Sequence, residues 1–228
     1  MADIFHLGVP PIEVTLKPSA RARRLSLRIS GVDGKVSLTL PRRTPMREAQ
    51  DFLRAKEDWI RGHLERQPDT TQVGIGSQVP VEGRMRLVAQ TRTRAVKLLD
   101  EHLLVPEGQD KAPARLRAFL KTLARDRLAE ASARHAANLG RSFGKITIRD
   151  TRSRWGSCTS EGNLMYSWRL ILAPPEVLDY VAAHEVAHLA EMNHSAAFWA
   201  EVETLLPGHT PARNWLKRNG SGLHRYRF

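Results

Sequence analysis

The sequence predicts an α+β fold, with an N-terminal antiparallel β-rich part and a C-terminal α+β domain that carries histidines on a helix and the turn after it. Alternating apolar and polar residues, the period of a strand, recur in two separate stretches of the chain. Apolar residues three and four positions apart, the period of a helix, separate and follow these stretches. We expect a basic β-rich part over residues 1–105 and the α+β domain over residues 106–228.

The N-terminal part begins with strand-like alternation. Strands are expected at residues 12–17, 24–29 and 35–40, with a GVDG turn between the last two. Thr44 and Pro45 stand in the order of a helix cap and a first helical residue, and the apolar stripe after them predicts one helix that ends before Pro68. Turn-forming residues make 67–80 the best candidate for a linker. Two further strands are expected at residues 85–90 and 95–100.

The C-terminal part begins with a long helix. The chain from Pro113 to Leu139 is rich in Ala, Leu and Arg at helical spacing, and Gly140 is a natural helix end. Pro174 and Pro175 open a later helix, which carries the histidines. Between these helices, strands are expected at residues 145–150, 153–158 and 163–170.

The composition narrows the class of protein. With 228 residues and 41% hydrophobic content, the chain can bury a sizeable core. No apolar run approaches the roughly 20 residues that cross a bilayer, and the first residues lack the pattern of a secretory signal. Cys158 is the only cysteine, so no internal disulfide can form. We therefore expect a cytoplasmic protein with no membrane partner.

The net charge of +12 suggests either an anionic partner or a solvated basic surface. Basic residues without acidic neighbours gather at 17–28 and at 84–97. Arg117, Lys121 and Arg125 share one face of the predicted long helix. A solvated surface is the simpler interpretation, because no aromatic residues that stack on bases are interleaved. Nucleic acid bound by the N-terminal part is the alternative.

The segment HEVAHLAEMNH, residues 184–194, is the most informative part of the sequence. On a helix, His184 and His188 lie one turn apart on one face, so both imidazoles can reach a single metal ion. Glu185 points about 100° away round the helix, which leaves its carboxylate free to take a proton from metal-bound water. This H-E-x-x-H pattern is typical of zinc peptidases. Burying these polar groups without a metal would be costly.

A catalytic zinc ion needs a third protein ligand and one open position. His194 is the strongest candidate, provided that the helix ends before it, because an unbroken helix would carry it about 9 Å further along the axis. Asn193 tolerates the left-handed conformation that ends helices, and Ser195 is a good cap for the next helix. A break is therefore expected between residues 191 and 194. The alternative third ligand is a glutamate of that next helix, Glu201 or Glu203.

Three segments resemble the YgjP-like metallopeptidases and, more distantly, the SprT-like proteases: RWGSC at 154–158, HEVAHLAEMNHSAAFW at 184–199 and WLK at 215–217. Looser similarity near the N-terminus and at residues 76–83 extends the resemblance over the full length. The resemblance implies a zincin fold and cytosolic residence. It also implies zinc ligation by His184, His188 and His194, and catalysis by Glu185.

These observations predict a zinc-dependent metallopeptidase, with Zn²⁺ as its cofactor and a peptide or protein as its substrate. An edge strand beside the histidine helix is expected to align the substrate, from residues 153–158 or 163–170. Trp155 and Trp168 in these segments have the alternative interpretation of ordinary core residues. The sequence does not rank the candidates for an oxyanion donor, which are Arg154, Tyr166, Tyr180 and His209.

Other functions stay open. A hydrolase of nucleotides or other phosphates would use the same metal site and hold the anion with the basic N-terminal part. A nucleic-acid-associated protease would use that basic surface for recruitment. A structural zinc module fits less well, because three ligands with a glutamate beside the first suit an open site. Cys158 is interpreted as a buried thiol rather than an inhibitory zinc ligand.

Overall fold

The structure is a computed structural model that describes residues 3–31, 33–65, 69–108 and 111–228. The chain divides into two compact units, Met1–Asp69 and Thr70–Phe228, each with its own hydrophobic core. The division therefore does not fall at the expected boundary between residues 105 and 106. It falls within the segment 67–80 that was predicted as a linker, of which residues 67 and 68 lie outside the described part of the chain.

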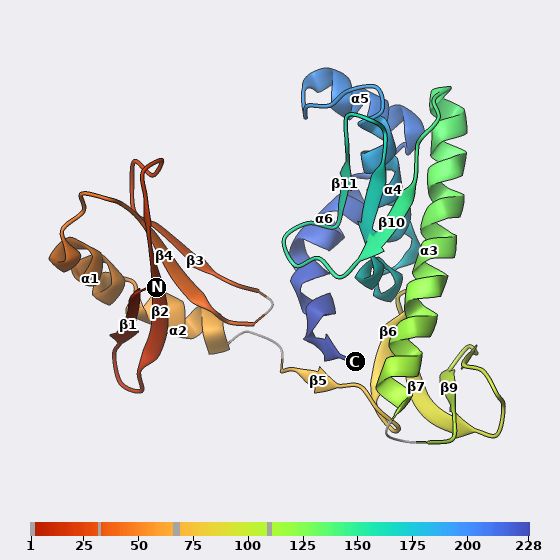
Figure 1. The fold of residues 1–228 in the computed structure, drawn as a ribbon, viewed down its shortest axis with the longest axis horizontal. Helices are drawn as coiled ribbons and strands as arrows, with labels where there is room; N and C mark the ends of the chain where they lie inside the picture. The colour runs from red at the N-terminus through yellow and green to blue at the C-terminus, as the bar shows by residue number, and fades with distance from the viewer. Residues whose placement is uncertain (1–2, 32, 66–68, 109–110) are drawn as a thin grey trace. The chain divides into compact units, whose positions relative to one another are not determined.

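The N-terminal unit packs helices against a sheet (Figure 1). The strands are β1 (Asp3–Leu7), β2 (Ile12–Ser19), β3 (Ser26–Ile29) and β4 (Val36–Pro41), and they lie in the order β1-β2-β4-β3. Strands β1 and β2 are antiparallel, as are β3 and β4, whereas β2 and β4 run parallel. The sheet is mixed rather than purely antiparallel, because the chain passes from β2 to the far side of β4 before the β3–β4 hairpin brings it back.

One helix was predicted in this unit, and the structure has two, α1 (Met46–Ala55) and α2 (Glu57–Glu65). The amide of Lys56 donates to the carbonyl of Leu53 at 3.1 Å, a bond over three residues that tightens the end of α1. Leu53 of α1 and Ile60 of α2 are both buried in the core of the unit. Because the apolar stripe continues across the break, the sequence shows no boundary there.

The C-terminal unit begins with a second sheet. Its strands are β6 (Gln78–Val81), β7 (Arg84–Thr91), β8 (Lys97–Leu98) and β9 (His102–Pro106), in the order β6-β7-β9-β8, and β5 (Thr71–Gln72) pairs with β13 (Tyr226–Arg227). Val79, Val88 and Leu103 are buried in the same core as the helices that follow. This shared core is why residues 70–105 belong to the C-terminal unit.

The β6–β7 turn fastens this sheet to the start of helix α4 (Pro175–Ala187). Glu82 and Gly83 have positive φ angles of 51° and 75°, which a two-residue hairpin turn favours. The amide of Glu82 donates to the carbonyl of Ile171 at 2.7 Å. A Cβ atom at Gly83 would lie 2.9 Å from Cα of Pro174, so only glycine allows this close approach.

The remaining elements surround α4. They are α3 (Ala112–Leu139), β10 (Ile146–Arg149), β11 (Gly156–Cys158), β12 (Leu164–Ser167), the 3₁₀ segments η2 (Trp168–Leu172) and η3 (Gly220–Arg225), α5 (Ala196–Leu205) and α6 (Thr210–Asn219). As predicted, α3 ends at Gly140, which has a left-handed φ of 66°. The strand expected to reach residue 170 ends at Ser167, because the next five residues form η2 and are buried all round rather than on alternate sides.

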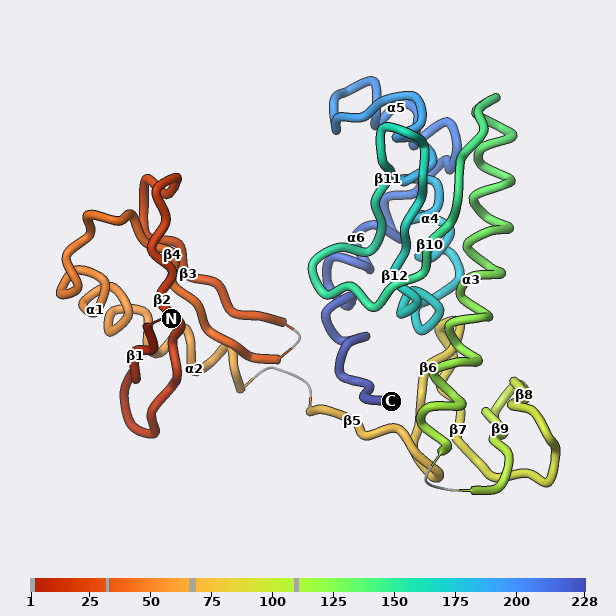
Figure 2. Tube along the Cα trace, viewed as in Figure 1, coloured from red at the N-terminus to blue at the C-terminus, as the bar shows by residue number. Residues whose placement is uncertain are grey.

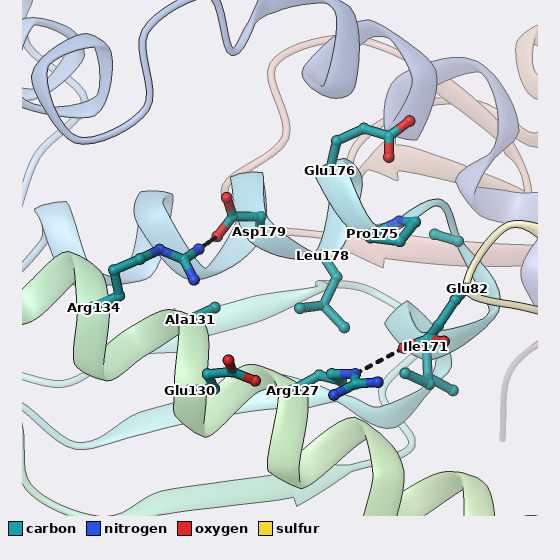
Figure 3. Close-up of a pocket in the computed structure, with 11 residues that line it drawn as sticks. Glu82, Arg127, Glu130, Ala131, Arg134, Ile171, Pro175, Glu176, Leu178 and Asp179 are labelled. Atoms are coloured by element: carbon teal, nitrogen blue, oxygen red, sulfur yellow. Dashed lines mark hydrogen bonds and ion pairs between the residues drawn. The ribbon is translucent and has the colours of Figure 1, made fainter.

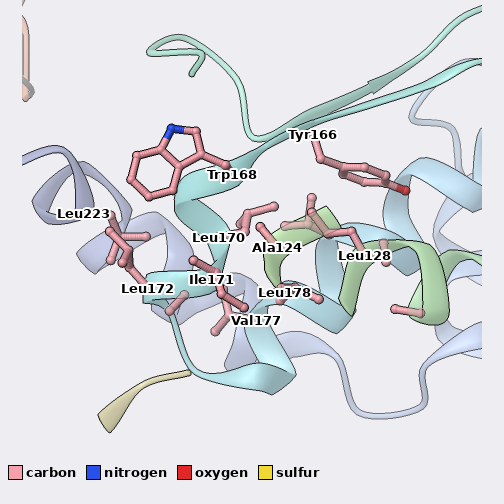
Figure 4. Packing of buried hydrophobic residues seen from close by; sticks show 14 of the residues in the cluster. Ala124, Leu128, Tyr166, Trp168, Leu170, Ile171, Leu172, Val177, Leu178 and Leu223 are labelled. Atoms are coloured by element: carbon pink, nitrogen blue, oxygen red, sulfur yellow. The ribbon is translucent and has the colours of Figure 1, made fainter. Parts of the chain in front are cut away.

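Helices α3 and α4 lie side by side, with β10 also against α3 (Figure 2). Leu128 of α3, Leu170 of η2 and Leu178 of α4 pack together in the core (Figure 4). Two ion pairs reinforce the packing of α3, one from Arg127 to Glu82 and one from Arg134 to Asp179 (Figure 3). Across the described residues, no helix combines the length and apolar character that crossing a bilayer requires.

Candidate metal centre

His184, His188 and His194 converge at the C-terminal end of α4. One ligand nitrogen from each imidazole lies within 4.8 Å of the other two, and Nε2 of His194 is 3.0 Å from Nε2 of His184. Helix α4 ends after Ala187, earlier than the break expected between residues 191 and 194. The amide of Leu189 then donates to the carbonyl of Val186 at 2.9 Å, a 3₁₀-type turn that starts the reversal.

The predicted cap of the following helix is confirmed. The side-chain oxygen of Ser195 accepts a hydrogen bond from the amide of Phe198 at 3.4 Å, and the Asn193 side chain accepts one from the amide of Ser195 at 3.1 Å. These bonds begin α5 and fix the short turn that precedes it. His194 lies in this turn and is thereby held beside the helix end.

The ring of His188 is oriented by a hydrogen bond on its far side. Nδ1 lies 2.9 Å from the carbonyl oxygen of Glu191. Since a carbonyl oxygen only accepts, Nδ1 carries the proton and Nε2 keeps a free lone pair. Metal-binding histidines are commonly held by this kind of bond to the backbone.

The electrostatics of the cluster favour neutral imidazoles. Burial, together with the neighbouring His188, His194 and Arg213, lowers the pKa of His184 to about 3. Burial also lowers the pKa of His188. A metal ion needs the unprotonated form of each ring, so these two imidazoles could bind one at neutral pH. Three imidazole nitrogens in this arrangement fit a divalent first-row ion such as zinc and leave a further coordination position.

Glu185 lies beside the cluster but outside it. The residue is 5% exposed and sits where α4 packs against β11. Burial raises the pKa of its carboxyl group to about 8, and the charge of Arg154 opposes this rise. A carboxyl group with a pKa in this range can accept and return a proton near neutral pH.

A stack of aromatic rings and one cation borders His184. The rings of Tyr180 and His209 are stacked, with centroids 5.7 Å apart, and His209 stacks in turn on Trp199. The guanidinium of Arg213 lies 4.0 Å from the centre of the Trp199 ring. Tyr180 also contacts the His184 ring edge-on. This stack carries positive charge close to the histidines and restrains the ring of His184.

The structure separates the proposed oxyanion donors. Tyr166 is fully buried, and its hydroxyl group lies 3.0 Å from that of Ser132. The hydroxyl group is therefore not on a solvent-exposed side of the histidine cluster. Tyr180 and His209 border His184 through the aromatic stack. Arg154 is exposed and close enough to act on the charge of Glu185.

The alternative third ligands lie elsewhere in the described chain. Glu203 accepts a hydrogen bond from the amide of Gly208 at 3.0 Å and pairs with Nδ1 of His209 at 2.9 Å. Neither Glu201 nor Glu203 belongs to the cluster of ligand atoms. Cys158 is half-buried, and burial, with the charge of Glu185, raises its pKa to about 11. At neutral pH this group is a thiol rather than a thiolate, which agrees with the prediction of a packed side chain.

The two predicted substrate strands differ in position. Among the described strands, β11 has a neighbour on one side only, whereas β12 lies between β10 and β11. The segment 153–158 therefore offers a free edge, and the segment 163–170 does not. Trp168 is completely buried in the core, and Trp155 is half-buried against His224 with ring centroids 5.3 Å apart.

The sequence interpretation missed two features. Gly156 lies against Glu185, and Arg213 caps the aromatic stack. The first belongs to the segment RWGSC, where the glycine was noted only as part of a resemblance. The second lies on α6, and nothing in its local sequence indicates that this helix approaches His184.

A hollow beside α4 lies away from the histidines. A pocket of about 470 Å³ lies beside the first turns of α4, and its lining includes the ion pairs of Arg127 with Glu82 and Arg134 with Asp179 (Figure 3). Both arginines of this lining are paired with acidic residues of the fold, and the lining includes none of the three clustered histidines. The chemically distinctive site is the cluster at the other end of the helix.

Comparison with known proteins gives a family match. The family described as YgjP-like, metallopeptidase domain, matches residues 23–219. Among solved structures, the chain is similar to the crystal structure of the metallopeptidase zymogen of Pyrococcus abyssi abylysin, with 24% sequence identity and a TM-score of 0.37. The similarity covers 44% of this chain and 99% of that one. No curated protein matches the chain.

Proposed function

The chain belongs to the YgjP-like metallopeptidase family, and on this premise we propose that it is a zinc-dependent peptidase in which His184, His188 and His194 hold the metal and Glu185 is the general base. One observation carries the proposal. Three imidazole nitrogens lie within 4.8 Å of one another, while the adjacent carboxylate is buried and outside their cluster. This arrangement separates the ligands from a group that moves protons.

The residues divide the work of peptide hydrolysis. A zinc ion bound here would act as a Lewis acid on the peptide carbonyl and would make a water molecule more acidic. Glu185 accepts the proton of the attacking water on a carboxylate oxygen. It then donates this proton to the nitrogen of the leaving amine, so that the carboxylate is regenerated. The hydrogen bond from His188 to the Glu191 carbonyl keeps that ring in place during the cycle.

We assign the alignment of the substrate to strand β11. Gly156 of this strand lies against Glu185, and among the described strands β11 has one unpaired edge, with which an extended peptide can pair through its main chain. Pairing of this kind fixes the peptide carbonyl relative to the general base, and it does not depend on most side chains of the substrate. Strand β12 is unsuited to this role, since both its edges are already paired.

The test compares the wild type with Glu185→Gln and His194→Ala, using cleavage of casein and zinc content as readouts. We expect Glu185→Gln to keep stoichiometric zinc and to lose peptide cleavage, because the amide cannot accept the proton. His194→Ala should lose zinc, whereas the matched variants Glu201→Gln and Glu203→Gln should keep it.

The same proteins should be assayed on nucleoside triphosphates. Hydrolysis of these compounds that persists in Glu185→Gln, without cleavage of casein by the wild type, would exclude the peptidase proposal. Zinc retained in full by His194→Ala would exclude the proposed ligand set.

A further inference from the structure

The N-terminal unit carries a groove that plays no part in the proposed chemistry. The groove has a volume of about 420 Å³ and is lined by four successive residues, 24–27, together with Phe52, Lys56 and Trp59. Successive residues of a strand point to opposite faces of a sheet. A hollow lined by four residues in a row therefore follows the edge of the β3 segment rather than either face of the sheet.

The main chain of β3 is available along this edge. Among the described strands, β3 pairs with β4 and has no neighbour on its other side. The amide of Ser30 donates to the carbonyl of Lys35 at 2.9 Å, which marks a hydrogen-bonded pair at the end of the ladder. Because such pairs alternate along an antiparallel ladder, the main-chain N–H and C=O of Leu27 point away from β4, toward the groove.

The side chains around the edge are of two kinds. Trp59 is 49% exposed, and Phe52 beside it is half-buried. Arg24, Arg28 and Lys56 are exposed cations. In the described part of the unit, none of these three forms an ion pair, in contrast to the arginines on α1 and α2, Arg47, Arg54 and Arg61. The groove thus combines a free strand edge, an apolar wall and uncompensated positive charge.

We propose that this groove binds an extended polypeptide, which adds to β3 as a further strand and carries acidic side chains in alternation with apolar ones. Side chains of the added strand point alternately to the two faces of the sheet. On one face, apolar side chains would contact Phe52 and Trp59. On the other, acidic side chains would meet Arg24 and Arg28.

A single-stranded nucleic acid accounts for fewer of these features. Its bases could stack on Trp59 and its phosphates could contact the cations, but it would leave the N–H and C=O of Leu27 unused. The polypeptide uses the strand edge, the apolar wall and the charge together. The inference goes beyond the peptidase activity and does not depend on the metal centre.

The test measures binding by the full chain carrying Glu185→Gln, with mass spectrometry to check that the probes stay intact. The probe is a fluorescein-labelled hexapeptide, Glu-Leu-Glu-Leu-Glu-Leu, followed by fluorescence anisotropy. A Lys-Leu hexapeptide and a Glu-Leu hexapeptide N-methylated at alternate residues are the comparison probes. We expect both to bind at least about tenfold more weakly, the first through charge repulsion and the second through lost main-chain donors.

Variants of the protein test each part of the groove. Joint reversal of Arg24→Glu and Arg28→Glu should weaken binding of the Glu-Leu probe at least about tenfold, whereas Arg42→Glu with Arg43→Glu, an equal change of net charge, should not. Leu27→Pro removes the outward N–H and should weaken binding more than Leu27→Ala, which removes only the side chain. Thermal unfolding of each variant checks that the unit remains folded.

Three outcomes would overturn the proposal. They are equal binding of the N-methylated probe, binding of the Glu-Leu probe that is unchanged by reversal of Arg24 and Arg28, and tighter binding of an oligothymidylate probe that depends on Trp59. Failure of casein cleavage would leave these measurements unaffected, since they record binding without hydrolysis.

Discussion

Gly156 lies directly against the carboxylate of Glu185. A Cβ atom at this position would be 2.5 Å from Oε1 and 2.6 Å from Cγ of Glu185, closer than such atoms pack. The glycine does not have an unusual φ angle, so its role is to leave space rather than to permit a turn. Strand β11 can approach α4 this closely only because residue 156 has no side chain.

We expect Gly156→Ala to displace the Glu185 carboxylate and to lower kcat for peptide cleavage by about a hundredfold. Zinc content should not change, since the methyl group faces the general base and not the histidines. Kinetics on a chromogenic peptide and metal analysis provide the measurement. The matched control is Gly62→Ala in α2, where a Cβ meets nothing within 4 Å and should raise stability by about 0.5–1 kcal/mol. A normal kcat with a raised KM would show that residue 156 contacts the substrate instead.

The hydroxyl pair of Ser132 and Tyr166 provides a second test. Both residues are fully buried, and the two oxygens are 3.0 Å apart. Tyr166→Phe should cost about 1–3 kcal/mol of unfolding free energy, because it leaves the Ser132 hydroxyl buried without its partner. Ser132→Ala should likewise leave the Tyr166 hydroxyl buried without its partner. The double variant should lose less unfolding free energy than the two single variants lose in sum.

Urea unfolding of the four proteins measures this coupling. Peptide cleavage per folded molecule should be unchanged in Tyr166→Phe. A large loss of kcat in that variant at full folding would return Tyr166 to the list of oxyanion donors.

Asp179 joins helix α3 to the helix that carries the histidines. Its Oδ1 pairs with Arg134 and lies 2.7 Å from Nε2 of His135, which is 2% exposed (Figure 3 shows the pair with Arg134). Burial raises the pKa of Asp179, but its bonds with His135 and the charge of Arg134 outweigh this effect, so the pKa lies below its ordinary value. The ionised form is therefore the one that stabilises the fold.

We expect Asp179→Asn to lower the unfolding free energy at neutral pH by about 1–3 kcal/mol. A carboxyl group whose pKa is lowered by folding stabilises the folded state in full at any pH above its pKa in the unfolded state, about 3.9. This stability is lost as pH falls through the pKa of the same group in the folded state. The difference between wild type and variant should accordingly shrink below about pH 4. Denaturation at pH 7 and pH 3.5 measures it, and a difference that persists undiminished in acid would contradict this account.

The sequence predicts elements with local signals well. Helix α3 was expected from Pro113 to Leu139 and spans Ala112–Leu139, because its periodicity and its final glycine lie within the segment itself. The turn that brings His194 to His184 also depends on residues adjacent in sequence, chiefly the helix cap at Ser195. All three histidines fall within 11 residues, so their meeting needs no long-range packing.

Features that depend on distant contacts were not predictable in this way. Residues 70–105 alternate apolar and polar positions like any β-rich segment, and only the burial of Val88 and Leu103 in the core that also contains residues of α3 assigns them to the C-terminal unit. The parallel pairing of β2 with β4 follows from a crossover that periodicity does not encode. The approach of Arg213 to the histidines likewise arises from the packing of α6 on α4.

His224 makes the fold sensitive to mild acid. The side chain is buried and its ring lies tilted against that of Trp155, and burial, with the nearby charge of Arg169, lowers its pKa to about 4. The unfolded chain takes up this proton at about pH 6.5, whereas the folded chain does so only near pH 4. Between these values the unfolded state binds more protons, so stability is lost as pH falls from about 6.5 to about 4.

We expect His224→Phe, which keeps a ring against Trp155 but cannot be protonated, to lose less stability than the wild type over this interval. The loss of stability between the two pH values should be smaller in the variant than in the wild type by about 1–3 kcal/mol, the order of magnitude of one to two pKa units. Urea unfolding of both proteins at pH 7 and at pH 4.5 measures it, after removal of metal so that proton and metal binding at the other histidines contribute equally. Parallel losses in the two proteins would mean that the protonated ring of His224 is accommodated in the fold, and that acid acts elsewhere.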